Sequence, residues 1–365
     1  MSHSNSVTLS SSVRVDLPAR SPFGYTIHIG GGLRYNAGEM IASVHTPCRV
    51  LLLTDDTVEG LYAEAVTASL LGAGFTVARH VIPHGEASKS AVSLIALLEK
   101  MATEHLTRSD LLVALGGGVV GDLGGFASAV YQRGIPFVQI PTTLLAMVDA
   151  SVGGKTAIDL EAGKNLAGAF HQPSLVICDV DCLKTLSAEI FGDGMAEVIK
   201  YAFISDRALF DALLGNATDN MEEIIRLCVE DKRILVEADE TDKGARQLLN
   251  LGHTVGHAIE SCSDFAISHG SAVAMGMVII TRAAVKTGVC KDDTLTALTA
   301  LLKKYGLPTE CPFTTEQLYA VALSDKKRAG GTITLVVPYG VADSRLVTVP
   351  VDALENYIRA GLSVD

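Results

Sequence analysis

The feature that most constrains the fold is a series of short, uninterrupted apolar runs in the first half of the chain. The runs at 50–54, 111–115 and 137–140 end at an aspartate, a glycine and a proline, and stretches with helical periodicity separate them. Unbroken apolar runs are typical of strands buried on both faces, and their alternation with helices indicates a parallel sheet. A later run at 175–178 fits the same sheet. We therefore predict an α/β domain with a mainly parallel, Rossmann-like sheet over residues 1–185.

The second half of the chain has a different character. Helical periodicity is found in the segments 187–214, 218–240, 245–262, 269–288 and 292–305, and a β-like run occurs only at 332–337. We predict a mainly α-helical domain over residues 186–365. We expect the active site in the cleft between the two domains, because ligands commonly bind where domains meet.

Composition excludes several classes of protein. Apolar residues make up 48% of the 365 residues, which is too many for a disordered chain, and the net charge of −12 without a long basic tract argues against nucleic-acid binding. No apolar run approaches the roughly 20 residues that cross a bilayer, and residues 1–20 lack the apolar core of a secretory signal. The seven cysteines include no CxxC pair and are typical of reduced thiols. We expect a cytoplasmic enzyme.

A glycine motif in the first half predicts a bound dinucleotide. Residues 116–121 satisfy GxGxxG between a predicted strand and a helical stretch, where glycines let backbone N–H groups approach a pyrophosphate. Asp55 ends an earlier strand, where a carboxylate accepts from a ribose hydroxyl, and the loop at 84–89 carries an acid and a base. The alternative is a tight strand–helix turn without a ligand. The motif is not in the first strand–helix unit, so we predict a dinucleotide in an arrangement that differs from the usual Rossmann one.

The segment 153–156, GGKT, resembles the end of a phosphate-binding loop. The full pattern GxxxxGK[ST] would need glycine at position 149, where the chain has Asp149, so a nucleotide triphosphatase is disfavoured. Lys155, Lys164 and Asn165 lie among small and apolar residues and lack the charged neighbours of a solvated face. We interpret these three side chains as facing a ligand, with a solvated surface as the alternative.

Four polar residues in the second half recur at helical spacing. Arg246, Asn250, His253 and His257 are separated by four, three and four residues, which predicts that one helix face carries all four. A hydrogen-bonded core position is the alternative for any single histidine. For the group that alternative is weaker, because each buried polar side chain without a partner costs roughly 1–3 kcal/mol.

A carboxylate and a third imidazole complete a candidate metal site. Glu197 and Lys200 stand three residues apart in an apolar helical segment, and His269 follows the helix that carries the other histidines. One carboxylate and two imidazoles are a typical catalytic zinc set that leaves a position open for substrate. Spacing alone does not decide which histidines are the ligands.

Basic residues accompany these motifs although the chain is acidic. The candidate cations are Arg133, Lys155, Lys164, Lys200, Lys232, Arg246 and Lys326. A locally positive site in a negative protein points to an anionic small molecule that carries phosphate and a carboxylate.

Six segments together resemble the 3-dehydroquinate synthase family. They are GGGVVGDLGGFAS, YQRGIPFVQIPTTLLAMVDASVGGKTAID, GKNLAGAFHQP, GMAEVIKYA, RQLLNLGHTVGHAIE and SHGSAVAMGM. The resemblance runs in consistent order from about residue 84 to 337 and covers most of the chain. It implies a phosphate-eliminating carbon–oxygen lyase of the shikimate pathway, in aromatic amino-acid and chorismate biosynthesis.

The implied reaction converts 3-deoxy-D-arabino-heptulosonate 7-phosphate to 3-dehydroquinate and phosphate. It would proceed by transient oxidation with NAD, phosphate elimination, re-reduction and intramolecular aldol closure. The implied cofactors are NAD and Zn²⁺ or Co²⁺. The implied partners are the anionic sugar phosphate and a second copy of the chain, with no nucleic acid and no membrane.

The resemblance also implies roles for individual residues. The metal ligands would be Glu197, His253 and His269, with His257 as a pocket residue near the reacting centre. The NAD side would comprise Asp55, Glu86, Lys89, Gly117, Gly118, Asp122, Thr142, Thr143, Lys155, Lys164 and Thr185. The substrate side would comprise Asp149, Lys155, Lys164, Asn165, Lys200, Lys232, Arg246, Asn250 and Lys326. Arg133 would reach the substrate of the neighbouring subunit in a homodimer.

Three other functions remain open from the sequence. A related sugar-phosphate cyclase that makes a valiolone or an inosose would share the fold, but the joint presence of residues 164–165, Arg246, Asn250 and His257 favours dehydroquinate. An NAD- and metal-dependent polyol dehydrogenase would have less use for so many cations. A non-catalytic nucleotide-binding protein would have no reason to keep three metal ligands. The choice between Lys326 and Lys327 as a substrate ligand also stays open.

Overall fold

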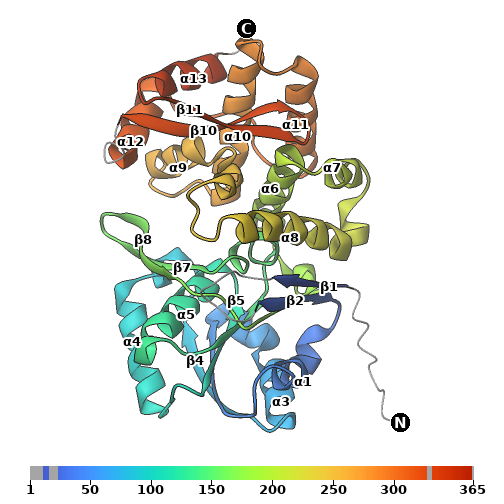
Figure 1. Cartoon of the computed structure of the whole chain (residues 1–365), viewed down its shortest axis with the longest axis vertical. Helices are drawn as coiled ribbons and strands as arrows, with labels where there is room; N and C mark the ends of the chain where they lie inside the picture. The colour runs from blue at the N-terminus through green and yellow to red at the C-terminus, as the bar shows by residue number, and fades with distance from the viewer. Residues whose placement is uncertain (1–10, 16–23, 327–330, 364–365) are drawn as a thin grey trace. The chain divides into compact units, whose positions relative to one another are not determined.

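The computed structural model describes residues 11–15, 24–326 and 331–363 and contains two compact units (Figure 1). The first unit takes in residues 1–186 with 232–237, and the second takes in residues 187–231 with 238–365. The segment 232–237 is the C-terminal part of the long helix Met221–Ala238, and nothing in the sequence indicated that it belongs with the first unit.

The first unit is built on a seven-stranded sheet with the order β1-β2-β9-β6-β5-β3-β4. Its strands are β1 Ser11–Val15, β2 Tyr25–Gly30, β3 Arg49–Asp55, β4 Thr76–Ile82, β5 Leu111–Gly116, β6 Phe137–Pro141 and β9 Leu175–Asp179. Only the β1–β2 pair is antiparallel among the pairings of this sheet. Every residue of β5, β6 and β9 is buried, as expected for strands covered on both faces. The predicted mainly parallel sheet is confirmed.

Helices flank this sheet. They are α1 Ala37–Ala42, α2 Asp56–Val58, α3 Glu64–Gly72, α4 Ala91–Thr103 and α5 Gly118–Val130. Short 3₁₀ turns lie at Leu33–Asn36, Glu86–Ser88, Tyr131–Arg133 and Val180–Thr185, and π-helical turns lie at Glu59–Ala63 and Ala146–Ala150. In Figure 1, α4 and α5 lie together on one side of the unit, and their apolar side chains pack on alternate residues of β3 and β5.

A hairpin that the sequence did not reveal completes the first unit. It consists of β7 Lys155–Leu160 and β8 Gly163–Phe170, which pair antiparallel. The glycine-rich helix α5 packs closely on it, since a Cβ at Gly125 would overlap the Thr156 side chain. The hairpin escaped prediction because β8 alternates half-buried and exposed residues and has no apolar run.

The second unit is mainly helical, as predicted. Its helices are α6 Ala188–Ile204, α7 Arg207–Leu214, α8 Met221–Ala238, α9 His253–Cys262, α10 His269–Lys286, α11 Asp292–Lys304, α12 Thr315–Lys326 and α13 Ala353–Leu362. Two 3₁₀ turns lie at Ala217–Asn220 and Ala245–Asn250. The predicted β-like run is the first strand of a hairpin, β10 Thr332–Gly340 with β11 Asp343–Pro350. Apolar side chains of α9, α10, α12, α13 and β10 form one core.

Two further expectations concern membranes and thiols. Within the described ranges, no helix is long and apolar enough to cross a membrane. All seven cysteines are free thiols, and four of them, Cys178, Cys182, Cys228 and Cys290, are buried.

Candidate active site

Three of the predicted metal ligands converge in the second unit. Glu197 lies in the middle of α6, and His253 and His269 are the first residues of α9 and α10. The Glu197 Oε1 atom is 3.5 Å from His253 Nε2 and 3.3 Å from His269 Nε2. One ligand atom from each residue lies within 4.8 Å of the other two. Residues 16 to 72 positions apart in sequence thus present a carboxylate and two imidazoles to one point.

Close helix crossings bring these ligands together. A Cβ at Gly276 of α10 would overlap the carbonyl oxygen of Gly252, the residue before α9, so only glycine permits this approach. A Cβ at Gly270 would overlap the backbone of Asp193 on α6. Ser268, the N-cap residue of α10, donates from its hydroxyl to Asp193 Oδ1 at 2.6 Å. These contacts hold the first turn of α10 against Asp193, which lies one helical turn before Glu197 on α6.

Burial and neighbouring charges shift the pKa values of the two imidazoles in this cluster in opposite directions. Glu197 and Lys200 are almost completely buried and form an ion pair one helical turn apart on α6. Burial, with smaller contributions from nearby Lys200 and His269, lowers the pKa of His253 to about 3 against the attraction of Glu197. Burial also disfavours charge on His269, but hydrogen bonds to Glu197 and Glu260 raise its pKa to about 10. One carboxylate and two imidazoles are the donor set of a catalytic divalent metal, so the residues fit such an ion.

The prediction that one helix carries four polar residues is wrong. Arg246 and Asn250 lie on the 3₁₀ turn Ala245–Asn250, and α9 begins only at His253. The break falls at Gly252, whose φ of 80° is left-handed and whose α-carbon packs against Val273 and Met277. Tertiary packing therefore overrides the helical spacing.

Three of the four residues are nevertheless held in defined places. Arg246 is buried, and its Nη1 donates to the Glu240 carbonyl oxygen at 2.6 Å. His257 lies one turn after His253, with ring centroids 5.4 Å apart and planes perpendicular. The His257 ring is also 6.2 Å from that of His269, so three imidazoles cluster here.

Sequence reasoning missed Glu260, which is buried beside His269. Its Oε2 lies 3.4 Å from His269 Nδ1. The spacing of three residues from His257 and seven from His253 was the available signal, because it places Glu260 on the same face of α9.

In the first unit, predicted NAD residues follow the carboxyl ends of neighbouring strands. Asp55 ends β3, Gly117 follows β5, and residues 142–143 follow β6. Gly117 is the N-cap of the 13-residue helix α5, whose first N–H groups and dipole favour an anion. In parallel α/β sheets this edge is where ligands bind. Asp55 already caps α2 through hydrogen bonds from the N–H groups of residues 57 and 58.

Lys89 contacts residues from both the NAD side and the substrate side as predicted from the sequence. Its buried Nζ lies 2.6 Å from Asp122 Oδ2 and 2.5 Å from Asn165 Oδ1, and Glu86 lies 4.0 Å away. Burial raises the pKa of Asp122, and the Lys89 charge opposes that rise. Asn165 adopts a left-handed φ of 57°, and its N–H donates to Asp159 Oδ1 at 2.8 Å. The hairpin is thus tied to the loop that carries Glu86 and Lys89.

Other predicted residues lie near this edge or on its turns. Lys232 of α8 donates to both the carboxylate and the carbonyl oxygen of Asp149, which lies in the π-helical turn Ala146–Ala150. Thr185 ends a 3₁₀ turn, and its hydroxyl is 2.5 Å from the Tyr62 hydroxyl. Lys155 begins β7 and is exposed, and Lys164 lies on β8 and is half-buried.

Two predicted residues stand apart from these clusters. Arg133 is exposed on a turn where both Gln132 and Arg133 have positive φ, at 48° and 70°. Such conformations are uncommon for residues other than glycine and often occur at functional positions. Lys326 is the last residue of α12, and its side chain and the whole of Lys327 lie outside the described residues.

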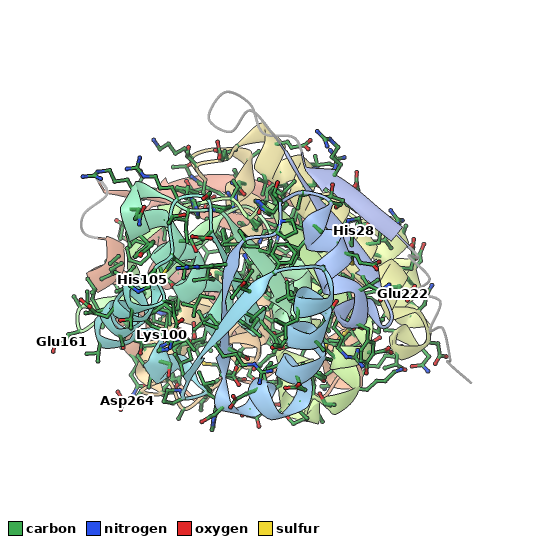
Figure 2. All side chains as sticks on the ribbon, turned by 90° about the horizontal axis from the view of Figure 1, so that it is seen from below. His28, Lys100, His105, Glu161, Glu222 and Asp264 are labelled. Atoms are coloured by element: carbon green, nitrogen blue, oxygen red, sulfur yellow. The ribbon has the colours of Figure 1, made fainter. Side chains whose placement is uncertain are left out.

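Charge is distributed unevenly. Glu161 and Asp264 are exposed and project outward in Figure 2. In contrast, Lys89, Lys200 and Arg246 are buried. These two acidic side chains thus lie at the surface, whereas the three cations are buried, and Lys89 and Lys200 are paired with carboxylates.

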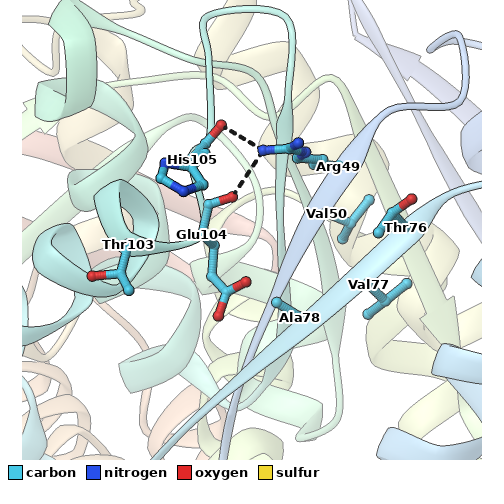
Figure 3. A pocket seen from close by; sticks show the side chains of 8 residues that line it. All are labelled: Arg49, Val50, Thr76, Val77, Ala78, Thr103, Glu104 and His105. Atoms are coloured by element: carbon cyan, nitrogen blue, oxygen red, sulfur yellow. Dashed lines mark hydrogen bonds between the residues drawn. The ribbon is translucent and has the colours of Figure 1, made fainter.

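A pocket of about 300 Å³ lies elsewhere in the first unit (Figure 3). It is lined by Arg49, Thr76 and neighbouring residues at the amino ends of β3 and β4, and by the end of α4. Arg49 Nη1 donates to the carbonyl oxygens of Glu104 at 3.3 Å and His105 at 3.2 Å. None of the predicted site residues lines this pocket, and it lies at the opposite end of β3 from Asp55.

Comparisons with known proteins identify relatives of this chain. Family models described as 3-dehydroquinate synthase N-terminal and C-terminal match residues 79–193 and 194–328. The chain is 42% identical over 342 residues to a 3-dehydroquinate synthase of Clostridium acetobutylicum, covering 92% of this chain and 96% of that one. It is 46% identical over 336 residues to one of Caulobacter vibrioides, covering 88% and 91%.

A solved structure shares the whole fold. The 2-epi-5-epi-valiolone synthase of Streptomyces hygroscopicus subsp. jinggangensis, with NAD⁺ and Zn²⁺ bound, has a TM-score of 0.85 and 27% identity. The alignment covers 95% of this chain and 98% of that one. The family models, the relatives and this shared fold therefore define a sugar-phosphate cyclase, a class of phosphate-eliminating enzyme.

Within that class, the chain belongs to the 3-dehydroquinate synthase family. The predicted family and enzyme activity are confirmed.

Proposed function

We propose that this protein converts 3-deoxy-D-arabino-heptulosonate 7-phosphate to 3-dehydroquinate and phosphate, with NAD⁺ and one divalent metal ion as cofactors. The observation that carries the proposal is the convergence of Glu197, His253 and His269 on one point. Family membership supports the reaction, and the valiolone synthase with the same fold binds NAD⁺ and Zn²⁺.

Glu197, His253 and His269 would hold the metal, and residues at the carboxyl ends of β3, β5 and β6 would hold NAD⁺. When bound, the metal would polarise substrate hydroxyls, and NAD⁺ would accept a hydride and return it. Three protein ligands leave a coordination position for the substrate. Gly117, Gly118 and the first turn of α5 would face the pyrophosphate, and Asp55 would accept from a ribose hydroxyl.

The cations would bind the anionic groups of the substrate. Arg246 and Lys200 from the second unit, with Lys155, Lys164 and Lys232 from the first, supply charges that complement a phosphate and a carboxylate. His257, an exposed imidazole one turn from His253, would exchange a proton with a substrate hydroxyl. These groups would act mainly by positioning the substrate and by stabilising charge.

We further propose a cytoplasmic homodimer in which Arg133 reaches the substrate of the partner subunit. The exposed turn with positive φ at Gln132 and Arg133 supports this role, because it presents Arg133 away from its own unit's core. The choice of Zn²⁺ or Co²⁺ is part of the proposal, since an imidazole and carboxylate set accepts either ion.

The test of this function is a substrate assay with complete product accounting. The purified protein with catalytic NAD⁺ and Zn²⁺ receives the heptulosonate phosphate, and phosphate, carbocycle and NADH are followed together. We expect equimolar phosphate and dehydroquinate with no accumulation of NADH. Stoichiometric NADH from a polyol, or preferred turnover of a heptulose 7-phosphate without the carboxylate, would instead identify a dehydrogenase or a related cyclase.

A further inference from the structure

His269 lies between two carboxylates that come from different helices. Its Nε2 is 3.3 Å from Glu197 Oε1 of α6, and its Nδ1 is 3.4 Å from Glu260 Oε2 of α9. Both carboxylates are buried. Glu260 has no role among the residues proposed above, yet it approaches the ring on the side opposite the candidate metal position.

The hydrogen bond to Glu260 determines what His269 offers at its other nitrogen. A neutral imidazole carries its proton on one nitrogen and a lone pair on the other. When Nδ1 donates to Glu260, the lone pair stands on Nε2 and points toward Glu197. Histidines that bind metals usually donate their other N–H to a carboxylate or a carbonyl, which fixes the ring and strengthens the ligand.

The backbone of α9 is well placed to hold Glu260 still. The Glu260 carbonyl oxygen, at the C-terminal end of the helix, accepts from the Ser263 hydroxyl at 2.8 Å and from the Phe265 N–H at 2.8 Å. His253 stands seven residues earlier on the same helix face. One helix therefore supplies a metal ligand and a hydrogen-bond acceptor for another ligand on α10.

We propose that Glu260 is a positioning residue that orients His269 for the metal through its Nδ1–H. This inference rests on the proposed metal site. The atoms of His257, Glu260 and His269 also lie within 4.8 Å of one another, which is the arrangement of a second ion site. Such a site would require His269 to bridge two ions through both nitrogens, so the metal stoichiometry separates the two readings.

The experiment measures metal binding and needs no turnover. The full-length protein is stripped with a chelator, and Zn²⁺ affinity is measured by competition with a chromophoric chelator. The visible spectrum of the Co²⁺ form is recorded, together with urea unfolding of the metal-free protein. The variants are Glu260→Ala, Glu260→Gln and, as the control, Glu223→Ala, a half-buried carboxylate that pairs with Arg226 on α8.

We expect one ion per chain in the unmodified protein. Glu260→Ala should bind Zn²⁺ roughly 10- to 100-fold more weakly, which is the usual effect of removing the hydrogen-bond acceptor of a metal-binding histidine. Glu260→Gln keeps an acceptor oxygen and should lose less than about 10-fold. The Co²⁺ spectrum should change in Glu260→Ala, and Glu223→Ala should retain both properties. A purely structural role would lower unfolding stability in Glu260→Ala without changing the Co²⁺ spectrum.

Two results would overturn the inference. One is unchanged Zn²⁺ affinity and Co²⁺ spectrum in Glu260→Ala, and the other is a second ion per chain that Glu260→Ala removes. If the unmodified protein binds no ion at all, the proposed metal site itself fails, which is a distinguishable outcome.

Discussion

Glu197 and Lys200 form a buried ion pair one helical turn apart on α6, at the point where His253 and His269 converge. Without metal, Lys200 and the protonated His269 supply the positive charge beside the Glu197 carboxylate. With metal, the ion itself supplies much of that charge. The stability of this helix should therefore depend on metal once Lys200 is removed.

We expect Lys200→Met to lower the free energy of unfolding of the metal-free protein by about 3–5 kcal/mol, because it leaves a carboxylate buried beside fewer cations. Saturating Zn²⁺ should recover a large part of this loss. Urea unfolding with EDTA and with Zn²⁺ measures both values. The control Lys184→Met breaks an exposed pair with Asp181 at the same i,i+3 spacing and should change stability by less than about 1 kcal/mol. Equal losses with and without Zn²⁺ would contradict the expectation.

Lys89 and Asp122 allow a structural role to be separated from cofactor binding. Lys89→Met leaves the half-buried Asp122 carboxylate without its partner at 2.6 Å, so unfolding stability should fall by about 2–3 kcal/mol and NAD⁺ should bind more weakly. The double variant Lys89→Met/Asp122→Leu should regain most of the stability but not the NAD⁺ affinity. Calorimetric titration with NAD⁺ beside urea unfolding checks both. A double variant that binds NAD⁺ normally would restrict the pair to a structural role.

Subunit mixing tests whether Arg133 acts on the partner's substrate. Arg133→Ala and His269→Ala should each be nearly inactive alone. A mixed dimer has one site with both groups intact if Arg133 reaches across, so mixing the two variants should restore roughly a quarter of the wild-type activity per chain by random pairing. No recovery after verified subunit exchange would show that Arg133 serves its own chain or none.

Asp231 should make the stability of the fold depend on pH. Burial, followed by the nearby charges of Asp206 and Glu230, raises its pKa to about 7. A carboxyl whose pKa is higher in the folded state than in the unfolded chain destabilises the fold as pH rises between the two values. Asp231→Asn mimics the protonated form. The free energy of unfolding of the variant should therefore equal that of the unmodified protein at about pH 3 and exceed it by about 2 kcal/mol at pH 8, allowing for solvent screening. A difference in unfolding free energy between the two proteins that stays the same at all pH values would contradict this expectation.

The parallel sheet was predictable because its central strands have a purely local signature. The runs 111–115 and 137–140 are unbroken and apolar, and the strands that contain them, β5 and β6, are buried along their whole length. The hairpin β7–β8 has no such signature, since its inner strand packs against the glycines of α5 and its outer strand is largely exposed.

The candidate site was predictable only in part. Spacing identified a cluster of imidazoles but gave no choice between His253, His257 and His269 as ligands, and the ligand set came from family resemblance. The helix break at Gly252 depends on Val273 and Met277 of α10, a contact that helical periodicity does not contain. Glu260 carried a usable signal in its spacing from His253, but a carboxylate on a helix face is equally typical of a solvated surface.

The metal content of the protein tests the central claim most directly. Equilibrium dialysis against buffered Zn²⁺ followed by elemental analysis should give one ion per chain for the unmodified protein. Glu197→Gln, His253→Ala and His269→Ala should each bind less than a tenth of that amount under the same conditions while keeping their circular dichroism. Full metal binding by all three folded variants would contradict the proposed site.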